Sequence, residues 1–149
     1  MKIRMGTRKD IPALAKLISS LAPWADYGIN DERAKKILLN MPDKIYVAEK
    51  EGELAGFITV RRNGMGEFGA YLRMSAVKES FQKQGSGKAL LEHAIRVVKP
   101  YARSVFCVCH VENKEACAFV EAFGFSQVGI MQDLYQKGYD EVLYRKQLR

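Results

Sequence analysis

The stretch Val77-Lys78-Glu79-Ser80-Phe81-Gln82-Lys83-Gln84-Gly85-Ser86-Gly87-Lys88 joins an expected strand to an expected helix through a polar loop with two glycines. The apolar run Tyr71 to Val77 precedes it, and Ala89-Leu90-Leu91 continues it with helical spacing. The first N–H groups of a helix have no intrahelical partner, and the helix dipole adds partial positive charge there. Glycine lets a phosphate approach the backbone, and Lys83 and Lys88 add full charges. The stretch therefore predicts an anion site.

Two well-known nucleotide loops do not fit this stretch. A Walker A loop has the pattern G-x-x-x-x-G-K-[S/T], whereas one residue separates Gly85 from Gly87 and Ala89 follows Lys88. A Rossmann loop needs a third glycine, where Leu90 stands, and belongs in the first βαβ unit. A helix entry without a ligand explains one glycine, but not two with flanking lysines and glutamines. We therefore expect the loop to bind an anionic ligand.

Length and composition favour one domain, residues 1–149, with a substantial core. No apolar run approaches the ~20 residues of a membrane span, and the first residues lack the apolar segment of a signal peptide. We therefore expect a cytoplasmic protein that does not bind a membrane. The net charge of +7 is scattered along the chain, and no nucleic-acid motif accompanies it, so we expect no nucleic-acid partner.

The three cysteines are expected to be core thiols. Cys107 and Cys109 alternate within an apolar run and would share one face of a strand, and Cys117 falls on the apolar face of an expected helix. An odd number of cysteines argues against a disulfide framework. A lone C-x-C pair is a poor zinc signal, so we expect no metal.

Hydrophobic periodicity predicts an α/β (α+β) protein with the element order β-α-α-β-β-β-α-β-α-β-β. This order favours one mixed sheet with helices on both faces. The expected helices cover residues 11–21, 31–41, 86–99 and 113–123. The expected strands cover residues 2–5, 45–49, 54–61, 68–77, 104–111, 125–134 and 142–146.

Two motifs on these elements resemble the GCN5-related N-acetyltransferase superfamily. Met74-Ser75-Ala76-Val77 followed by residues 82–87 is similar to its acyl-coenzyme A motif, Q/R-x-x-G-x-G/A. Asn113 and the segment Ala118-Phe119-Val120-Glu121-Ala122-Phe123-Gly124-Phe125 resemble its second motif, N-x-x-A-…-F-Y-E-x-x-G-F. The matching element order covers almost the whole chain. The resemblance implies the acyl-CoA N-acyltransferase fold, a single mixed, largely antiparallel sheet that splays after the strand ending at Val77.

The resemblance also implies the acyl donor, acetyl-CoA, and the residues that hold it. In this family the pantetheine arm lies in the splayed gap, between backbone groups on one side and Asn113 on the other. Asn113 also suits a helix N-cap. The loop amides wrap the pyrophosphate, with the Ser86 hydroxyl and the Lys88 ammonium as additions. The implied donor residues are Ser75, Ala76, Val77, Gln82, Lys83, Gln84, Gly85, Ser86, Gly87, Lys88 and Asn113.

The implied reaction is direct transfer of an acetyl group from the thioester to a primary amine, which must first lose a proton. Backbone amides near Val77 would polarise the thioester carbonyl. The family's usual acid, the tyrosine of F-Y-E, is Val120 here, and two frequent positions for a glutamate base fall on Val108 and Tyr71. The catalytic residue stays open, with Glu67 and Tyr71 as weak candidates. Proton transfer through ordered water is an alternative.

Further candidates for proton transfer come from the residues themselves, and each also has a structural interpretation. His110 ends an expected strand, where a lone histidine is more often a bystander, and Cys117 lies one turn before Val120 on an apolar face.

In this family the acceptor pocket is commonly shaped by the loop after the first helix and by the last hairpin. Here these are residues 22–30 and 134–141, which place aromatic side chains beside carboxylates. They would either form an acceptor pocket or serve as ordinary loop residues. The residues concerned are Trp24, Asp26, Tyr27, Asp133, Tyr135, Tyr139 and Asp140.

The function implied by the resemblance is an N-acetyltransferase that acts on a small-molecule or peptide amine. The alternative is a non-catalytic acyl-CoA sensor or regulatory module, because Val120 and the missing base remove the usual proton-transfer groups. The acceptor amine, the length of the acyl group and the oligomeric state stay open. One option for the last is a homodimer paired through the last hairpin.

Overall fold

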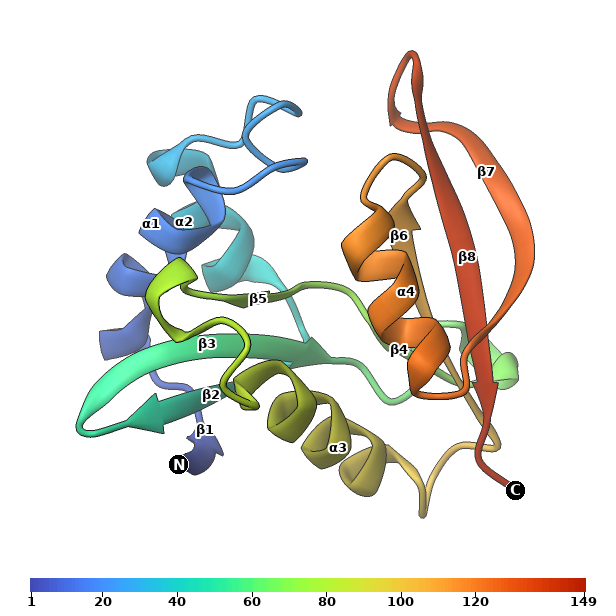
Figure 1. Ribbon diagram of the computed structural model, residues 1–149, viewed down its shortest axis with the longest axis horizontal. Helices are drawn as coiled ribbons and strands as arrows, with labels where there is room; N and C mark the ends of the chain where they lie inside the picture. Colours follow the sequence, from blue (N-terminus) through green and yellow to red (C-terminus); the bar gives the residue numbers. More distant parts are fainter. The chain divides into compact units, whose positions relative to one another are not determined.

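The computed structural model describes residues 1–149 and divides the chain into two compact units (Figure 1). The first unit comprises Met1–Arg61 and Arg73–Val97. The second comprises Arg62–Leu72 and Val98–Arg149. The chain therefore enters the second unit twice, and β4 is contributed by the first passage.

The first unit is built around an antiparallel sheet with the strand order β1-β2-β3-β5. Its strands are β1 (Lys2–Met5), β2 (Lys44–Lys50), β3 (Glu53–Val60) and β5 (Ser75–Val77). Its helices are α1 (Ile11–Ser19), α2 (Asp31–Asn40) and nearly all of α3 (Ser86–Val98), with short 3-10 turns at Arg8–Asp10 and Glu79–Phe81.

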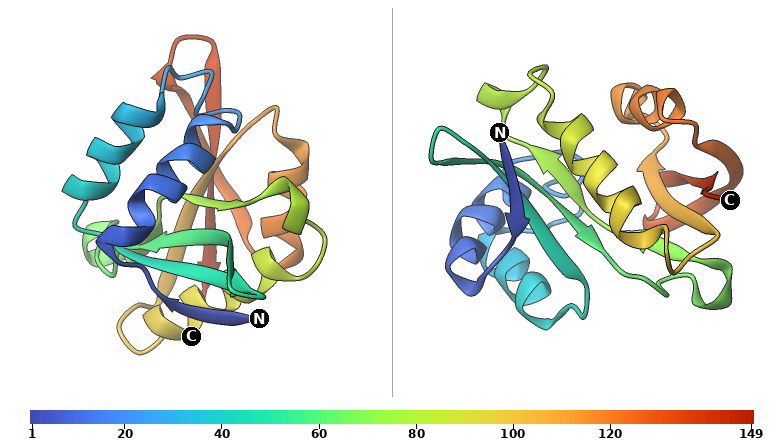
Figure 2. Two further views of the ribbon diagram at one scale, coloured as in Figure 1. Left: turned by 90° about the vertical axis from the view of Figure 1, so that its left-hand side faces the viewer. Right: turned by 90° about the horizontal axis from the view of Figure 1, so that it is seen from below.

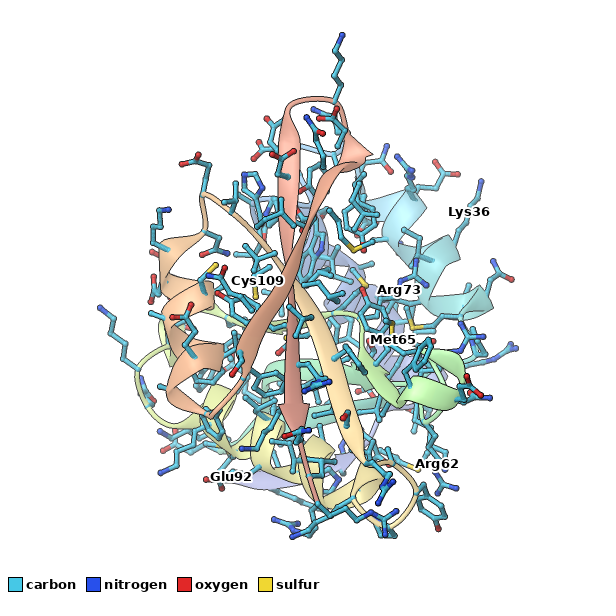
Figure 3. All side chains as sticks on the ribbon, turned by 90° about the vertical axis from the view of Figure 1, so that its right-hand side faces the viewer. Lys36, Arg62, Met65, Arg73, Glu92 and Cys109 are labelled. Carbon is cyan, nitrogen blue, oxygen red and sulfur yellow. The ribbon has the colours of Figure 1, made fainter.

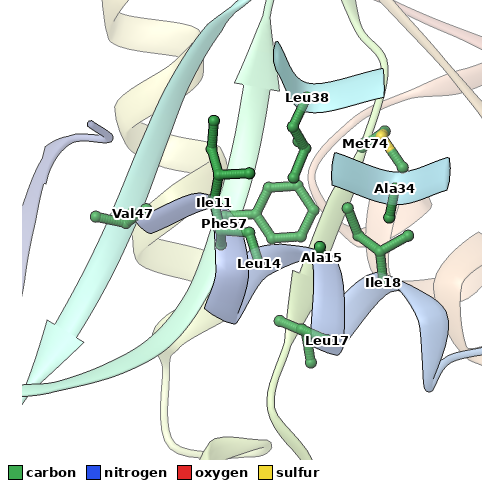
Figure 4. Close-up of a cluster of buried hydrophobic side chains, with 10 residues drawn as sticks. All are labelled: Ile11, Leu14, Ala15, Leu17, Ile18, Ala34, Leu38, Val47, Phe57 and Met74. Carbon is green, nitrogen blue, oxygen red and sulfur yellow. The ribbon is translucent and has the colours of Figure 1, made fainter. Parts of the chain in front are cut away.

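Helices cover both faces of this first sheet (Figure 2). Val47 and Phe57 belong to the same buried cluster as the apolar faces of α1 and α2, shown in Figure 4. Successive strand residues point to opposite faces, so Tyr46 points away from that cluster. Its ring lies 4.6 Å from that of His93 on α3. The predicted placement of helices on both faces is confirmed within this unit.

The start of the chain is fixed by an ion-pair network. The Arg4 guanidinium donates to Asp10 at 2.8 and 2.9 Å and to Glu49 at 2.6 Å. The Asp10 carboxylate also accepts from the backbone N–H of Thr7 at 2.7 Å, as in a capping box. The Arg4 guanidinium, above all, lowers the pKa of Asp10 to about 2. The network joins β1, β2 and the turn before α1.

The second unit contains a mixed sheet with the strand order β4-β6-β8-β7. Its strands are β4 (Ala70–Leu72), β6 (Ser104–His110), β7 (Ser126–Gln136) and β8 (Tyr139–Gln147), and its helix is α4 (Lys114–Ala122). The pair β4–β6 is parallel and the others are antiparallel. A short 3-10 turn, Gly66–Phe68, precedes β4. In the same unit Arg62, labelled in Figure 3, stacks 3.6 Å from the ring centroid of Tyr101.

Helix α4 covers one face of this second sheet. Tyr144 on β8 is fully buried, and its hydroxyl donates to Glu121 on α4 at 2.6 Å. Cys107 lies opposite Tyr144 in the ladder, so it shares the face that α4 covers. The three cysteines are free thiols. Cys107 and Cys117 are buried, which confirms their interpretation as core residues, whereas Cys109 is half-buried. The opposite face carries Phe106, Val108 and His110 because strand residues alternate.

The predicted strand 68–77 is wrong in one respect, because it is two strands that belong to different sheets. β4 pairs in parallel with β6, whereas β5 pairs antiparallel with β3. Gly69 has φ 147°, and a Cβ there would lie 2.2 Å from the carbonyl oxygen of Ser104, so only glycine permits this close approach. At the other end Met74 O accepts from Thr59 N at 2.8 Å, and Met74 N donates to Thr59 Oγ1 at 3.0 Å.

The remaining differences from the predicted elements are small. The expected single sheet consists of two four-stranded hydrogen-bonded sheets, and the mixed, largely antiparallel pattern is confirmed. Helix α1 ends at Ser19 instead of residue 21, and β8 begins at Tyr139 instead of residue 142. No helix has both the length and the apolar character needed to cross a membrane.

Candidate functional site

Strand β5 is one of the two outer strands of the first sheet, and its backbone groups divide between the two sides. Met74 O accepts from Thr59 N, and Lys78 N donates to Ala55 O at 2.8 Å, so both residues turn toward β3. Backbone groups alternate along a strand, so Ala76 also turns toward β3, and Ser75 and Val77 turn toward the outer edge. Ser75, Ala76 and Val77 were expected to pair with an extended ligand. Only the backbone groups of Ser75 and Val77 point toward the outer edge, where such a ligand can pair.

One of these outward groups has a partner within the protein. The Gln82 side chain donates from Nε2 to Val77 O at 3.1 Å. The open groups at this edge are therefore the N–H and C=O of Ser75 and the N–H of Val77. Gly56 in β3 makes the arrangement possible, because a Cβ at that position would lie 2.5 Å from Ala76 O. A glycine inside an apolar strand is the sequence signal of such a close approach.

The loop after β5 has the backbone conformation of an anion-binding turn. Lys83 and Gly85 have φ of 62° and 90°, and a Cβ on Gly85 would meet no atom within 4 Å. The N–H of Ala89 donates to Gly85 O at 3.0 Å, so the N–H groups of Ser86 to Lys88 form the first turn of α3. Such N–H groups lack intrahelical acceptors, and turns with left-handed residues form concave anion sites. This backbone fits a pyrophosphate.

Three lysines surround this loop, and the sequence analysis identified only two of them. Lys83 and Lys88 are exposed, as expected. The third is Lys50, whose Nζ donates to Gln84 Oε1 at 2.7 Å. The pairing of β2 with β3 brings Lys50 beside a loop more than thirty positions away, and no local pattern indicates that. The positive charge at the loop is therefore greater than its own residues supply.

The Ser86 side chain does not take the position expected of it. Ser86 is only 1% exposed, and its Oγ is buried without a hydrogen-bond partner. The hydroxyl thus points into the protein, away from the solvent side where an anion would lie. The backbone N–H of Ser86 remains the group of this residue that suits the anion.

Asn113 lies in the second unit and caps α4. Its Oδ1 accepts from the N–H of Ala116 at 3.1 Å, which confirms the predicted N-cap. The side chain is half-buried. The capping bond fixes the side chain at the start of the helix.

The face of the second sheet opposite α4 gathers several titratable side chains. Tyr71 on β4 pairs with Phe106 on β6, and His110 lies four residues further along β6 on the same face. Glu67 does not join them. It lies in the exposed turn before β4, and because β4 runs parallel to β6, that turn is at the opposite end of β6 from His110.

His110 forms a pair with a buried carboxylate that the sequence analysis missed. Its Nδ1 lies 3.3 Å from Glu141 Oε2 and 3.1 Å from Asp140 O. The His110 and Glu141 side chains are 11% and 4% exposed. Glu141 was missed because the last strand was predicted to start at Val142. The observed strand starts earlier and sets Glu141 opposite His110 in the ladder.

Val120 occupies the position of the family's usual tyrosine acid, and Tyr144, Cys109 and Cys117 are poor replacements for it. Val120 is buried. Burial, together with the hydrogen bond to Glu121, raises the pKa of Tyr144, which is also inaccessible. Burial raises the pKa of Cys117, and a hydrogen bond from Cys107 raises that of Cys109, so neither thiol is prone to ionise.

Some residues expected to shape an acceptor pocket have structural roles instead. Trp24 packs against the core of the first unit, with its ring 6.4 Å from Phe57. In the last hairpin the N–H of Asp133 donates to Asp140 Oδ1 at 3.0 Å, and the N–H of Gly138 donates to Asp133 Oδ1 at 2.7 Å. The two carboxylates therefore hold the turn.

The other four residues of that group remain accessible in part. Asp26 and Tyr135 are exposed, and Tyr27 and Tyr139 are half-buried. The ring of Tyr139 lies 5.2 Å from that of His110.

An extended ligand edge followed by an anion-binding turn defines an acyl-CoA-dependent transferase on this fold. Residues 11–125 match the acetyltransferase (GNAT) family, and the chain belongs to that family. It is therefore an N-acetyltransferase that uses acetyl-CoA as donor and a primary amine as acceptor.

Individual relatives agree with this assignment. The chain is 27% identical over 154 residues to an N-alpha-acetyltransferase of Sulfolobus acidocaldarius, covering 95% of this chain and 89% of the relative. The fold matches a ribosomal-protein-alanine N-acetyltransferase from Brucella melitensis with a TM-score of 0.79 and 22% identity, over 99% of both chains. It also matches an aminoglycoside 6'-N-acetyltransferase complexed with coenzyme A, with a TM-score of 0.79 and 17% identity, over 100% and 98% of the chains.

Proposed function

We propose that this acetyltransferase acetylates the α-amino group at the N-terminus of a peptide or protein. The observation that carries the proposal is the 27% identity to an N-alpha-acetyltransferase along nearly the whole chain. The solved structures share the fold at lower identity, and their acceptors range from a ribosomal protein to an aminoglycoside, so they do not favour one acceptor.

The donor residues follow from the geometry of β5 and its loop. In this proposal Ser75 and Val77 pair with the extended arm of the donor. Ala76 pairs with Phe57 on β3 and so holds the strand in position. The pyrophosphate lies on the backbone N–H groups of the loop and the first turn of α3, from Gln84 to Lys88, near Gln82 and Lys83. Lys50 adds a third ammonium to this region. Asn113, at the start of α4, is assigned to the donor by the resemblance of its motif alone.

The donor supplies an activated acetyl thioester, and the chain supplies position and proton transfer. Backbone N–H groups near Val77 would stabilise negative charge that develops on the carbonyl oxygen, without titrating. Of the two catalytic candidates, Tyr71 shares a sheet face with other titratable groups, whereas Glu67 lies in an exposed turn at the other end of β6. We therefore retain Tyr71 as the catalytic candidate and do not favour Glu67.

A panel of acceptors tests the α-amine proposal. Peptides with a free N-terminus are compared with the same peptides bearing a blocked N-terminus and one internal lysine, and with polyamines, amino acids and an aminoglycoside. Release of free coenzyme A and mass spectrometry of the peptide are measured together. We expect turnover with free α-amines and acetyl on the first residue. Equal turnover with the blocked, lysine-containing peptides, or turnover with small amines only, would contradict the proposal.

We further propose that residues 1–149 act as one acetyltransferase domain in the cytoplasm. The family match from residue 11 to residue 125 includes segments of both units, which supports a single functional domain. Limited proteolysis with and without acetyl-CoA tests this. A fragment containing only one unit that retained full activity would contradict it.

We also propose a homodimer formed through β7. β7 is an outer strand of eleven residues with all side chains exposed. Long, apolar outer strands are usually protected by a partner. The exposed apolar residues are Val128, Ile130, Met131, Leu134 and Tyr135. Light scattering after size exclusion should show a dimer that Ile130→Lys converts to a monomer, whereas a monomeric parent protein at tens of micromolar would contradict the proposal.

A further inference from the structure

His110 is held in one defined protonation pattern by its two acceptors. Its Nδ1 lies 3.1 Å from Asp140 O and 3.3 Å from Glu141 Oε2. A backbone carbonyl oxygen can only accept a hydrogen bond, so Nδ1 must carry the proton. In the neutral ring the second nitrogen, Nε2, then has a free lone pair. The pair therefore presents a proton acceptor of fixed orientation.

The other nitrogen of His110 is available to a ligand. Nε2 makes no hydrogen bond within the protein, and it is not buried. His93, the only other histidine, differs in this respect, because its Nε2 is buried and unpartnered. Burial, with the charge of Arg96 as a smaller cause, lowers the pKa of His93. His110 is thus the one histidine that can exchange a proton with a ligand.

His110 also shares a face of the second sheet with a position that the family resemblance assigns to a base. The frequent position of the family's glutamate base falls on Val108, which cannot accept a proton. His110 is two residues further along β6 and therefore on the same face, about 7 Å away at ~3.3 Å per residue. The imidazole side chain and one ordered water can together span a distance of that order.

We propose that His110 is the general base that removes the proton from the acceptor ammonium, and that Glu141 is its positioning residue. The carboxylate of Glu141 keeps the ring in the Nδ1–H form and stabilises the imidazolium, in the manner of a carboxylate–histidine pair. The groups that face the ring are Glu141 and Tyr139 from β8. Farther along the same face lie Tyr71 and Arg145, both beside Phe106.

The proton-transfer step balances with groups that the reaction already supplies. The acceptor ammonium gives one proton to Nε2, directly or through a water, and becomes a neutral amine. The amine nitrogen forms the C–N bond, the C–S bond breaks, and the leaving thiolate takes the second proton from the nitrogen. The imidazolium returns its proton to solvent. The proposal rests on acetyl transfer to an amine and does not depend on whether that amine is a peptide N-terminus.

Kinetic pH profiles of matched variants provide the first test, with any amine that supports turnover. His110→Asn keeps a donor near the position of Nδ1 but cannot accept the ammonium proton. We expect kcat to fall by roughly 10²-fold or more with little change in the KM for the amine, and the acidic limb of the profile to disappear. His93→Gln is the matched control and should keep the acidic limb. Thermal unfolding of each variant confirms that it is folded.

Glu141→Gln tests the positioning role separately. It keeps the shape of the side chain and removes its charge, so the imidazolium loses its stabilisation. We expect a smaller fall in kcat and a shift of the acidic limb to lower pH. A variant that lost stability but kept the limb in place would show a merely structural role for Glu141 and overturn that part of the proposal.

The tautomer of His110 is a second readout that needs no acceptor and no activity. Long-range nitrogen–proton NMR spectra of the intact chain contain two imidazole patterns, and the His93→Gln spectrum assigns them. We expect the Nδ1–H form for neutral His110. The Nε2–H form, or full activity of His110→Asn with its acidic limb intact, overturns the proposal. Because the spectrum is independent of the acceptor, failure of the α-amine proposal would not affect this result.

Discussion

Gly85 holds a left-handed backbone at the turn where the donor's pyrophosphate is proposed to lie. Its φ is 90°, and a Cβ there would meet no atom within 4 Å, so an alanine is opposed only by backbone strain. Gly138, in the β7–β8 turn, has φ 87° and equally open surroundings. The two glycines therefore differ in location and not in local geometry.

We expect Gly85→Ala and Gly138→Ala to cost about 1 kcal/mol of stability each, because alanine disfavours positive φ. Only Gly85→Ala should weaken acetyl-CoA binding, since its methyl group and altered backbone disturb the loop amides. Calorimetric titration and urea unfolding measure the two effects. Equal acetyl-CoA affinity in both variants would argue against the pyrophosphate assignment.

Asp10 makes stability depend on pH in a defined window. Its folded pKa, about 2, lies below the ordinary value of 3.8, chiefly because it accepts hydrogen bonds from Arg4. A lowered folded pKa means that the stabilisation is complete above pH 4 and is lost as the pH falls toward 2. From the size of the shift, the contribution at pH 7 is roughly 2 kcal/mol.

We therefore expect Asp10→Asn to lower the free energy of unfolding at pH 7 and to approach the parent protein near pH 2. Asp31→Asn is the control, because Asp31 forms only an exposed pair with Lys35 on α2. Urea unfolding at several pH values measures the difference. A gap between Asp10→Asn and the parent that stayed constant from pH 7 to pH 2 would rule out the ion-pair explanation.

At the scale of elements, the starts of α2 and α4 form a natural comparison. Asn30 Oδ1 accepts from Arg33 N at 2.9 Å, and Asn113 Oδ1 accepts from Ala116 N at 3.1 Å. Both asparagines are N-caps, and only Asn113 is proposed to contact the donor.

We expect Asn30→Ala and Asn113→Ala each to cost about 1 kcal/mol of stability, the usual loss for a removed N-cap. Asn113→Ala should in addition raise the KM for acetyl-CoA, while Asn30→Ala leaves it unchanged. Steady-state kinetics and thermal unfolding separate the two effects. An unchanged KM in Asn113→Ala would restrict Asn113 to its capping role.

For the whole molecule, donor binding can be measured as an increase in stability against unfolding. Acetyl-CoA at a hundred times its Kd should stabilise the fold by about 2.7 kcal/mol. For a chain of this size that corresponds to a rise in Tm of roughly 5–10 °C. Pantetheine, which lacks the pyrophosphate, is the control and should raise Tm much less at the same concentration. An equal rise with pantetheine would show that the glycine loop contributes little to affinity.

The fold was predictable to the extent that its signals are local. The buried face of α1, the N-cap at Asn113 and the glycine loop all follow from spacing and side-chain chemistry within a few residues. The division of residues 68–77 was not predictable, because β4 and β5 are both extended and apolar and differ only in their partner strands. Lys50 and Glu141 were missed for the same reason, since strand pairing brings each beside its partner.

The sequence by itself determined the class of this protein. Its element order and its two motifs indicate an acetyl-CoA-dependent N-acetyltransferase, because backbone amides at a helix start need only glycines and correct spacing to bind a pyrophosphate. Only the tertiary structure decided where the titratable groups meet. In the sequence His110 is an isolated residue. In the structure it pairs with the buried carboxylate of Glu141, because the register of β6 against β8 sets Glu141 opposite it. Register depends on long-range pairing, and no local pattern encodes it.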